Sequence, residues 1–318
     1  MLGMKVKKLS VATTEGDWVG SVTKLNPSQP NNTCSDDSTT CYPDSDDSNH
    51  CPDSEWMMSE LSAEEVTQAA DCCYIQASDK EKALTTCARH LTSDKGDRDV
   101  ALSNLKATLA WRNSNGVSEL RNLQRGDDLA DKMEHELGTH GRLCVRGRDK
   151  EGRAIVHIVT RHAPRGGVQD KAAYIQSHCL AFERAVAATE RYGEKTDLIV
   201  AADLSDFAMW QIPNLELTKE LSHMAGAYYP NRLYKLYVID APRLFRLFWM
   251  LLRPFLDPET VAKYQFVSGR KQKDKILGTA IDADQAMPHM LSDGKLTEPW
   301  DIQRFLYDVD FDKAYDEK

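Results

Sequence analysis

The sequence predicts an α/β fold: a mainly parallel sheet with crossover helices, preceded by a small helical subdomain. From Gly141 onward, strand-like runs alternate with helical stripes, an order that requires right-handed crossovers and parallel strands. Residues 198–202 are all apolar, as expected for a strand that is covered on both faces. Further strands are expected at residues 154–159, 236–239 and 265–267.

Two crossover helices are expected from apolar residues that recur at spacings of four, three and four. Such a stripe lies along one face of a helix and predicts that this face is buried. Gly193 is expected to end the first helix, and Pro213 lies near the start of the second. The two stripes are Ile175, Cys179, Phe182 and Val186, and Leu217, Leu221, Met224 and Tyr228.

The chain is expected to have four parts. Residues 25–79 contain twelve Asp or Glu and no Lys or Arg, so without them the net charge changes from −9 to +3. The first part of this stretch has too few aliphatic residues to offset the entropy of ordering. We therefore expect a disordered acidic segment at 1–55, a helical subdomain with a connector at 56–140, the α/β domain at 141–300 and a tail at 301–318.

The helical subdomain should begin close to Ser59 or Ser62, since either serine could cap a helix. Glu64 and Glu65 would then lie in its first turn, where the helix dipole favours negative charge. The subdomain should end near Gly116, and a helical connector should follow it.

Several function classes are excluded or disfavoured by the sequence. No apolar leader or continuous run of transmembrane length is present, which favours a cytoplasmic protein. No basic run with interleaved aromatic residues indicates nucleic-acid binding. The eight cysteines lack zinc spacings, and no nucleophile elbow, dinucleotide turn or phosphate loop is present. We therefore expect no metal, no cofactor and no catalytic residues.

The most informative stretch lies between Pro242 and Asp257, where nearly every residue is large and apolar. The exceptions are Arg243, Arg246 and Arg253, which fall within about 80° on a helical wheel. The run is too short to span a bilayer, which needs about 20 residues. Two interpretations stay open: a buried core helix, or a helix that covers an apolar cavity and meets a membrane surface.

Short motifs surround this helix, and others lie earlier in the chain. They are Tyr229-Pro230-Asn231-Arg232-Leu233, Asp240-Ala241-Pro242, the segment 253–260, Asp149-Lys150-Glu151-Gly152-Arg153, Asp203-Leu204-Ser205 and Leu109-Ala110-Trp111-Arg112. Their order resembles that of the CRAL-TRIO lipid-binding family, and most closely that of its phosphatidylinositol/phosphatidylcholine transfer proteins. The resemblance covers roughly residues 83–294 and is most specific at the helix itself, which we call the gate helix. It implies that the gate helix covers an apolar lipid pocket.

The resemblance implies binding of a phospholipid, with phosphatidylinositol favoured, and its transfer or presentation between membranes without catalysis. The protein should then contact membrane surfaces transiently. Phe245, Phe248 and Leu252 lie on the face away from the three arginines and are expected to face the pocket or the bilayer.

The polar end of the pocket is expected just after the gate helix. Asp257 is placed as an N-cap with Pro258 at the first helical position. Thr260 and Lys263 are three residues apart and share a face. The resemblance implies that these two contact a phosphoinositide headgroup, and Arg232 is expected to add a second charge.

Three departures from the family pattern make the pocket more apolar. Asn231 replaces a headgroup-binding Glu, and residues 92–97 replace an arginine-rich segment. Leu198 and Val200 replace a polar pair on the pocket floor, which argues against phosphatidylcholine. A carrier of a neutral hydrophobe therefore stays open. So does a regulatory module on the same fold that binds a protein partner through the acidic N-terminal segment.

Overall fold

The computed structural model describes residues 51–208, 211, 215–297 and 300–311. At its centre is a five-stranded sheet in the order β1-β2-β3-β4-β5. Only β1 runs antiparallel to its neighbour β2, and the other neighbouring pairs are parallel. The predicted α/β class with a mainly parallel sheet is therefore confirmed. The strands are β1 (Leu143–Arg148), β2 (Ala154–Val159), β3 (Leu198–Asp203), β4 (Leu233–Ile239) and β5 (Tyr264–Val267).

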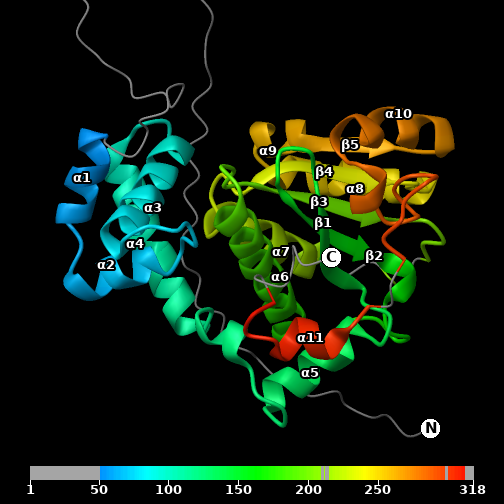
Figure 1. Ribbon diagram of the computed structural model, residues 1–318, viewed down its shortest axis with the longest axis horizontal. Helices are drawn as coiled ribbons and strands as arrows, with labels where there is room; N and C mark the ends of the chain where they lie inside the picture. The colour runs from blue at the N-terminus through cyan, green and yellow to red at the C-terminus, as the bar shows by residue number, and fades with distance from the viewer. Residues whose placement is uncertain (1–50, 209–210, 212–214, 298–299, 312–318) are drawn as a thin grey trace, which may run out of the picture. The chain divides into compact units, whose positions relative to one another are not determined.

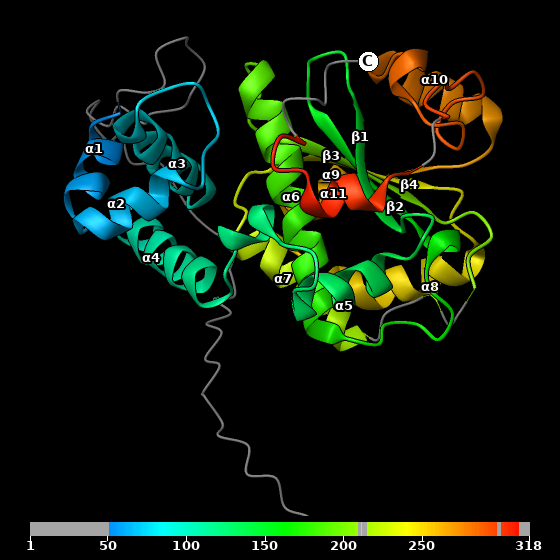
Figure 2. The same cartoon turned by 60° about the horizontal axis from the view of Figure 1, so that its bottom comes forward.

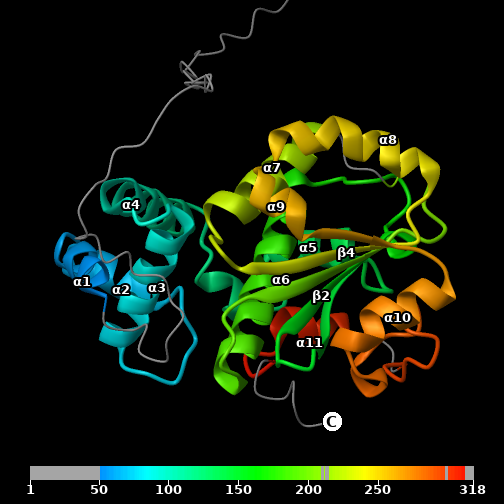
Figure 3. The ribbon, with the colours of Figure 1, turned by 90° about the horizontal axis from the view of Figure 1, so that it is seen from above.

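Helices cover both faces of the sheet. Figure 3 shows α7, α8 and α9 on one side of the sheet and α10 on the other. Because side chains alternate along a strand, Val200 packs with residues of α6 in one core, whereas Ile199 packs with Leu277 of α10 in a second. The helices of this region are α6 (Lys171–Tyr192), α7 (Leu215–Ala227), α8 (Arg243–Leu252), α9 (Pro258–Lys263) and α10 (Arg270–Ala280), with 3-10 turns η2 (Thr160–His162), η4 (Arg253–Phe255) and η5 (Ala283–Gln285).

The helical region before the sheet has its own core, and Figure 1 shows α1 to α4 as one group. Ser62 is the N-cap of α2, with a reciprocal capping box to Glu65, so the second of the two predicted caps is confirmed. The connector to the sheet contains η1 and α5. These elements are α1 (Pro52–Ser59), α2 (Ala63–Ala70), α3 (Asp79–Ser93), α4 (Arg98–Ser114), η1 (Glu119–Asn122) and α5 (Asp128–Leu137).

The structure moves the predicted boundary of the acidic segment. Helix α1 begins at Pro52, and Ser54 and Met57 are buried, so a disordered segment cannot extend to residue 55. Proline is well tolerated in the first turn because the amide it lacks would have no partner there. Residues 1–50, which carry most of the acidic segment and the predicted contact with a protein partner, lie outside the described residues.

The predicted C-terminal tail is wrong for the residues that the structure describes. Helix α11 (Ile302–Tyr307) places Phe305 and Leu306 at 0% exposure in the core that includes α6. Figure 2 shows α11 beside α6, and Phe311 joins the same core. Burial of three large apolar side chains makes this segment part of the α/β domain.

Strand β1 and helix α10 were not predicted from the sequence. The second half of β1 is Arg146-Gly147-Arg148, which hides its alternating pattern, and α10 buries only Leu277. Gly147 has φ +69°, and a Cβ there would overlap the carbonyl oxygen of Gln285. Only glycine fits this position, because it allows η5 to approach β1 closely.

Candidate functional site

The gate helix is α8, and its start is fixed by polar contacts at the end of β4. Asp240 has φ +49°, and its carboxylate accepts hydrogen bonds from Lys273 Nζ at 2.7 Å and from the Gly269 amide at 2.9 Å. Partial burial opposes the charge of Asp240, but these hydrogen bonds hold its pKa below the ordinary value. Hydrogen bonds from the start of α10 therefore fix the turn that leads from the sheet into α8.

The inner face of α8 is aromatic and lies toward the sheet. Phe245 and Phe248 are half-buried, with ring centroids 5.8 Å apart, and Leu252 is buried. Trp249 packs on β5, with its ring 4.3 Å from that of Tyr264 and 5.8 Å from that of Phe266. The structure thus brings the three predicted gate residues together on one face.

Leu198 and Val200 lie on the same side of the sheet as α8. Val200 is paired with Leu236, which is paired with Tyr264, the residue under Trp249. Both side chains are buried in the core that also contains residues of α6. Their contact with a lipid stays a prediction.

The outer face of α8 exposes large apolar side chains, which sequence reasoning missed. Arg243, Arg246 and Arg253 are also exposed, and within the described part of the chain none of them forms an ion pair. The arginines and the exposed leucines therefore share one surface. The missed signal is that Leu247 and Leu251 fall beside Arg243 on the helical wheel, and that Met250 falls within the arginine sector. The exposed apolar residues are Leu244, Leu247, Met250, Leu251 and Phe255, at 42% to 64% exposure.

The predicted cap of the next helix is confirmed. Asp257 accepts a hydrogen bond from the Thr260 amide at 2.7 Å, and Pro258 occupies the first turn of α9. Burial opposes the charge of Asp257, but the hydrogen bonds from Thr260 hold its pKa below the ordinary value. Lys263 is half-buried, without an ion pair to any described residue. The headgroup role of Thr260 and Lys263 stays a prediction.

The predicted headgroup role of Arg232 is contradicted by its surroundings. Its side chain is only 6% exposed and forms an ion pair with Glu190. Its guanidinium also donates to the carbonyl oxygens of Thr196 at 2.6 Å and Cys72 at 2.8 Å. Arg232 therefore neutralises a buried carboxylate and ties β4 to the segment after α2. The sequence motif located this arginine but could not show its partner.

A second buried ion pair joins the helical region to α6. Arg112 of α4 donates to Glu183 through two hydrogen bonds, of 2.7 and 3.0 Å, and the Tyr74 hydroxyl donates to the same carboxylate. Burial opposes the charge of Glu183, but Arg112 holds its pKa below the ordinary value. The sequence signal is that Glu183 and Glu190 fall seven residues apart, which places both carboxylates on one face of α6.

The described residues give no sign of metal or thiol chemistry. Among them, no group of three or more His, Cys, Asp or Glu could hold a metal ion. Burial raises the pKa of Cys87, Cys144 and Cys179 to about 12, so these thiols stay protonated at neutral pH. Within the same ranges, no helix is both long and apolar enough to cross a bilayer.

Comparisons with known proteins agree with this geometry. A phosphatidylinositol transfer protein, CSR1, of Eremothecium gossypii is 29% identical over 63% of this chain and 43% of its own length. A phosphatidylinositol/phosphatidylcholine transfer protein, SFH7, of Arabidopsis thaliana is 26% identical over 65% of this chain and 38% of its own. The chain thus aligns with less than half of either relative.

The fold is shared with a solved structure. The crystal structure of Sfh5 has a TM-score of 0.50 over 70% of this chain and 83% of that one, at 12% identity, which shows the fold alone. The family model of the CRAL/TRIO domain matches residues 138–289, a range that includes the whole sheet and the gate helix. Residues 138–289 therefore match the CRAL/TRIO domain, and the chain carries this domain over the sheet and the gate helix.

Proposed function

We propose that this protein binds a phospholipid between the sheet and α8, and exchanges it at the surface of a membrane without catalysing a reaction. The observation that carries the proposal is the two-sided gate helix. Its inner face places aromatic rings against the sheet, and its outer face exposes leucines and arginines. Two relatives named as phosphatidylinositol transfer proteins support phosphatidylinositol as the ligand.

The outer face of α8 has the composition expected of a membrane contact. Exposed apolar side chains gain roughly 1.5–3 kcal/mol each when fully buried in an apolar phase. Arginines close to an anionic lipid surface add about 1 kcal/mol each. Phe255 extends this surface, and Lys219 of α7 lies 3.5 Å above its ring. A helix of this kind lies in the membrane interface rather than across it.

The two faces can be tested separately with paired variants. Leu247→Asp with Leu251→Asp should abolish vesicle binding and lipid exchange but leave lipid in the purified protein, because only the outer face changes. Phe248→Asp with Leu252→Asp should remove the bound lipid as well. Val309→Asp is the matched control, since Val309 is 54% exposed and lies outside α8. Unchanged exchange in both gate variants would contradict the proposal.

The headgroup is tested at Lys263. Lys263→Ala should remove a charge-assisted contact of roughly 1.5–3 kcal/mol, which corresponds to about tenfold to a hundredfold in affinity. The loss should apply to phosphatidylinositol and spare a neutral lipid in the same transfer assay. Equal loss for both ligands would mean that Lys263 supports the fold, and no loss for either would remove the headgroup assignment.

A neutral hydrophobe is the second candidate ligand, because Leu198 and Val200 make this side of the sheet apolar. Solvent extraction of the purified protein followed by mass spectrometry distinguishes the candidates. A phospholipid at near-stoichiometric amount supports the first ligand, and a sterol-like or carotenoid-like molecule supports the second. Protein that purifies without any lipid and stays stable would favour a regulatory module instead.

A further inference from the structure

A hollow of about 400 Å³ lies on the face of the sheet opposite to α8. It is lined by strands β4 and β5, by the turn between β1 and β2, and by α10. Tyr237 of its lining belongs to the core on the α10 side and is paired with Gln265. Trp249 of the gate helix packs instead on Tyr264 and Phe266, the neighbours of Gln265. Side chains alternate between the two faces of β5, so the hollow and the proposed lipid site lie on opposite faces of the sheet.

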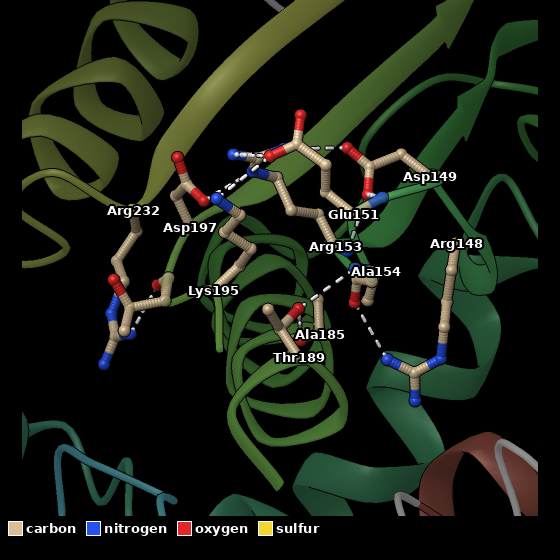
Figure 4. Close-up of polar contacts among 12 residues, drawn as sticks. Arg148, Asp149, Glu151, Arg153, Ala154, Ala185, Thr189, Lys195, Asp197 and Arg232 are labelled. Atoms are coloured by element: carbon tan, nitrogen blue, oxygen red, sulfur yellow. Dashed lines mark hydrogen bonds and ion pairs between the residues drawn. The ribbon is translucent and has the colours of Figure 1, made fainter. Parts of the chain in front are cut away.

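One wall of the hollow is a turn held by ion pairs around the buried Arg153, which Figure 4 shows. Arg153 donates to Asp149 at 3.0 Å and to Asp197 at 2.6 Å, and forms an ion pair with Glu151 at 3.2 Å. Burial opposes the charge of Arg153, but these carboxylates hold its pKa above the ordinary value. Lys195 forms a further ion pair with Glu151 at 3.0 Å. These ion pairs therefore fix the conformation of the turn without a bound ligand.

The remaining lining is partly aromatic. The register between β3 and β4 shifts after Leu198–Leu233, so that Ile199 is paired with Lys235 and Tyr234 is the extra residue. Such an irregularity re-aims a side chain at the edge of a strand. The Tyr234 ring is 37% exposed, and the Arg153 guanidinium lies 3.7 Å from its centre. Tyr237, Ile276 and Ala280 complete the apolar part of the lining.

The charges around the hollow do not cancel. Lys150 is paired with Asp282 at 3.5 Å, and the acidic groups of the turn are paired with Arg153 and Lys195. Lys235 and Lys275 also line the hollow, but neither forms an ion pair with any residue in the described part of the chain. The two lysines therefore face the hollow without a direct counterion, next to a lining that is partly made of rings and aliphatic side chains.

We propose that this hollow is a second binding site, which takes a small anion carried on a planar ring. Its volume falls within the range of about 300–1,000 Å³ that is usual for small-molecule pockets. The two lysines supply donors for a phosphate or carboxylate group. Tyr234 and Ile276 supply the surface on which a ring can pack. The site goes beyond the proposed lipid function and does not depend on it.

Titration of the full-length protein with phenyl phosphate, followed by ligand-observed NMR, tests the proposal. Inorganic phosphate and phenol serve as the anion alone and the ring alone, and phenyl phosphate should bind more tightly than either. Lys235→Gln and Lys275→Gln should each weaken phenyl phosphate binding about tenfold, the loss expected for one charge-assisted contact. Lys271→Gln is the matched control, because Lys271 is exposed on α10 but does not line the hollow.

A near-isosteric variant guards against loss of the fold. Gln265→Glu places a negative charge in the lining and should weaken phenyl phosphate binding without lowering the melting temperature by more than a few degrees. Benzoate in place of phenyl phosphate separates a carboxylate from a phosphate ligand. Lipid exchange by the Lys235→Gln and Lys275→Gln double variant should match that of the wild type.

Three results would overturn the proposal. The first is failure of phenyl phosphate and benzoate to bind the wild-type protein at millimolar concentration. The second is equal affinity in the wild type and the double lysine variant. The third is loss of lipid exchange in that variant in proportion to the loss of phenyl phosphate binding, which would mean that the hollow is not a separate site.

Discussion

The buried pair of Arg112 and Glu183 gives the sharpest test of how the helical region is attached. Their side chains are only 7% and 3% exposed, and two hydrogen bonds join them. Glu183→Gln keeps the shape of the side chain but leaves the Arg112 charge buried without a counterion. Removing one partner of such a pair costs about 3–5 kcal/mol, because the remaining charge stays desolvated. We expect a loss of that size in the free energy of unfolding.

The double variant separates the pair from its surroundings. In Arg112→Met with Glu183→Leu, no charge is left buried, and apolar replacements of similar volume are often neutral or stabilising. Urea denaturation of the wild type, both single variants and the double variant gives the coupling energy. The double variant should be more stable than Glu183→Gln by at least about 2 kcal/mol. A cost below about 1 kcal/mol for Glu183→Gln, or additive costs, would refute the reasoning.

Three further predictions concern His90, Arg232 and Gly147. Burial and the Arg89 charge lower the pKa of His90 to about 4 in the folded protein. In the unfolded chain this histidine has an ordinary pKa of about 6.5 and therefore binds more protons below that pH. The free energy of unfolding should then fall as the pH drops from about 6.5 to about 4. For His90 alone the loss at pH 5 is about 2 kcal/mol, and equal urea midpoints at pH 7 and pH 5 would contradict it. Arg232→Met should lower the free energy of unfolding by about 1–3 kcal/mol, because the hydrogen bonds of Arg232 are lost while Glu190 keeps Arg89 as a counterion. Binding of phosphatidylinositol and of neutral ligands should weaken equally. A stable variant that fails only with phosphatidylinositol would restore the headgroup role of Arg232. Gly147→Ala should cost at least about 2 kcal/mol, through the left-handed backbone and the overlap with Gln285; a urea midpoint equal to that of the wild type would show that η5 can move away.

The sequence determined the elements whose signals are local. The apolar run of β3, the stripes of α6 and α7, the Ser62 capping box and the Asp257 cap all reside in neighbouring residues. The length and composition of α8 likewise set it apart from an ordinary surface helix. These features depend on backbone geometry and residue spacing, so they can be predicted from the sequence without knowledge of the neighbouring elements.

Tertiary structure decided what each side chain meets. Arg232 belongs to a motif that the sequence revealed, but its burial against Glu190 depends on residues 42 positions away. The outer leucines of α8 and the core position of Phe305 also depend on which neighbours are present. The hollow beneath β4 and β5 is assembled from four separate segments. Burial and charge pairing are properties of long-range contacts, and single-sequence periodicity does not contain them.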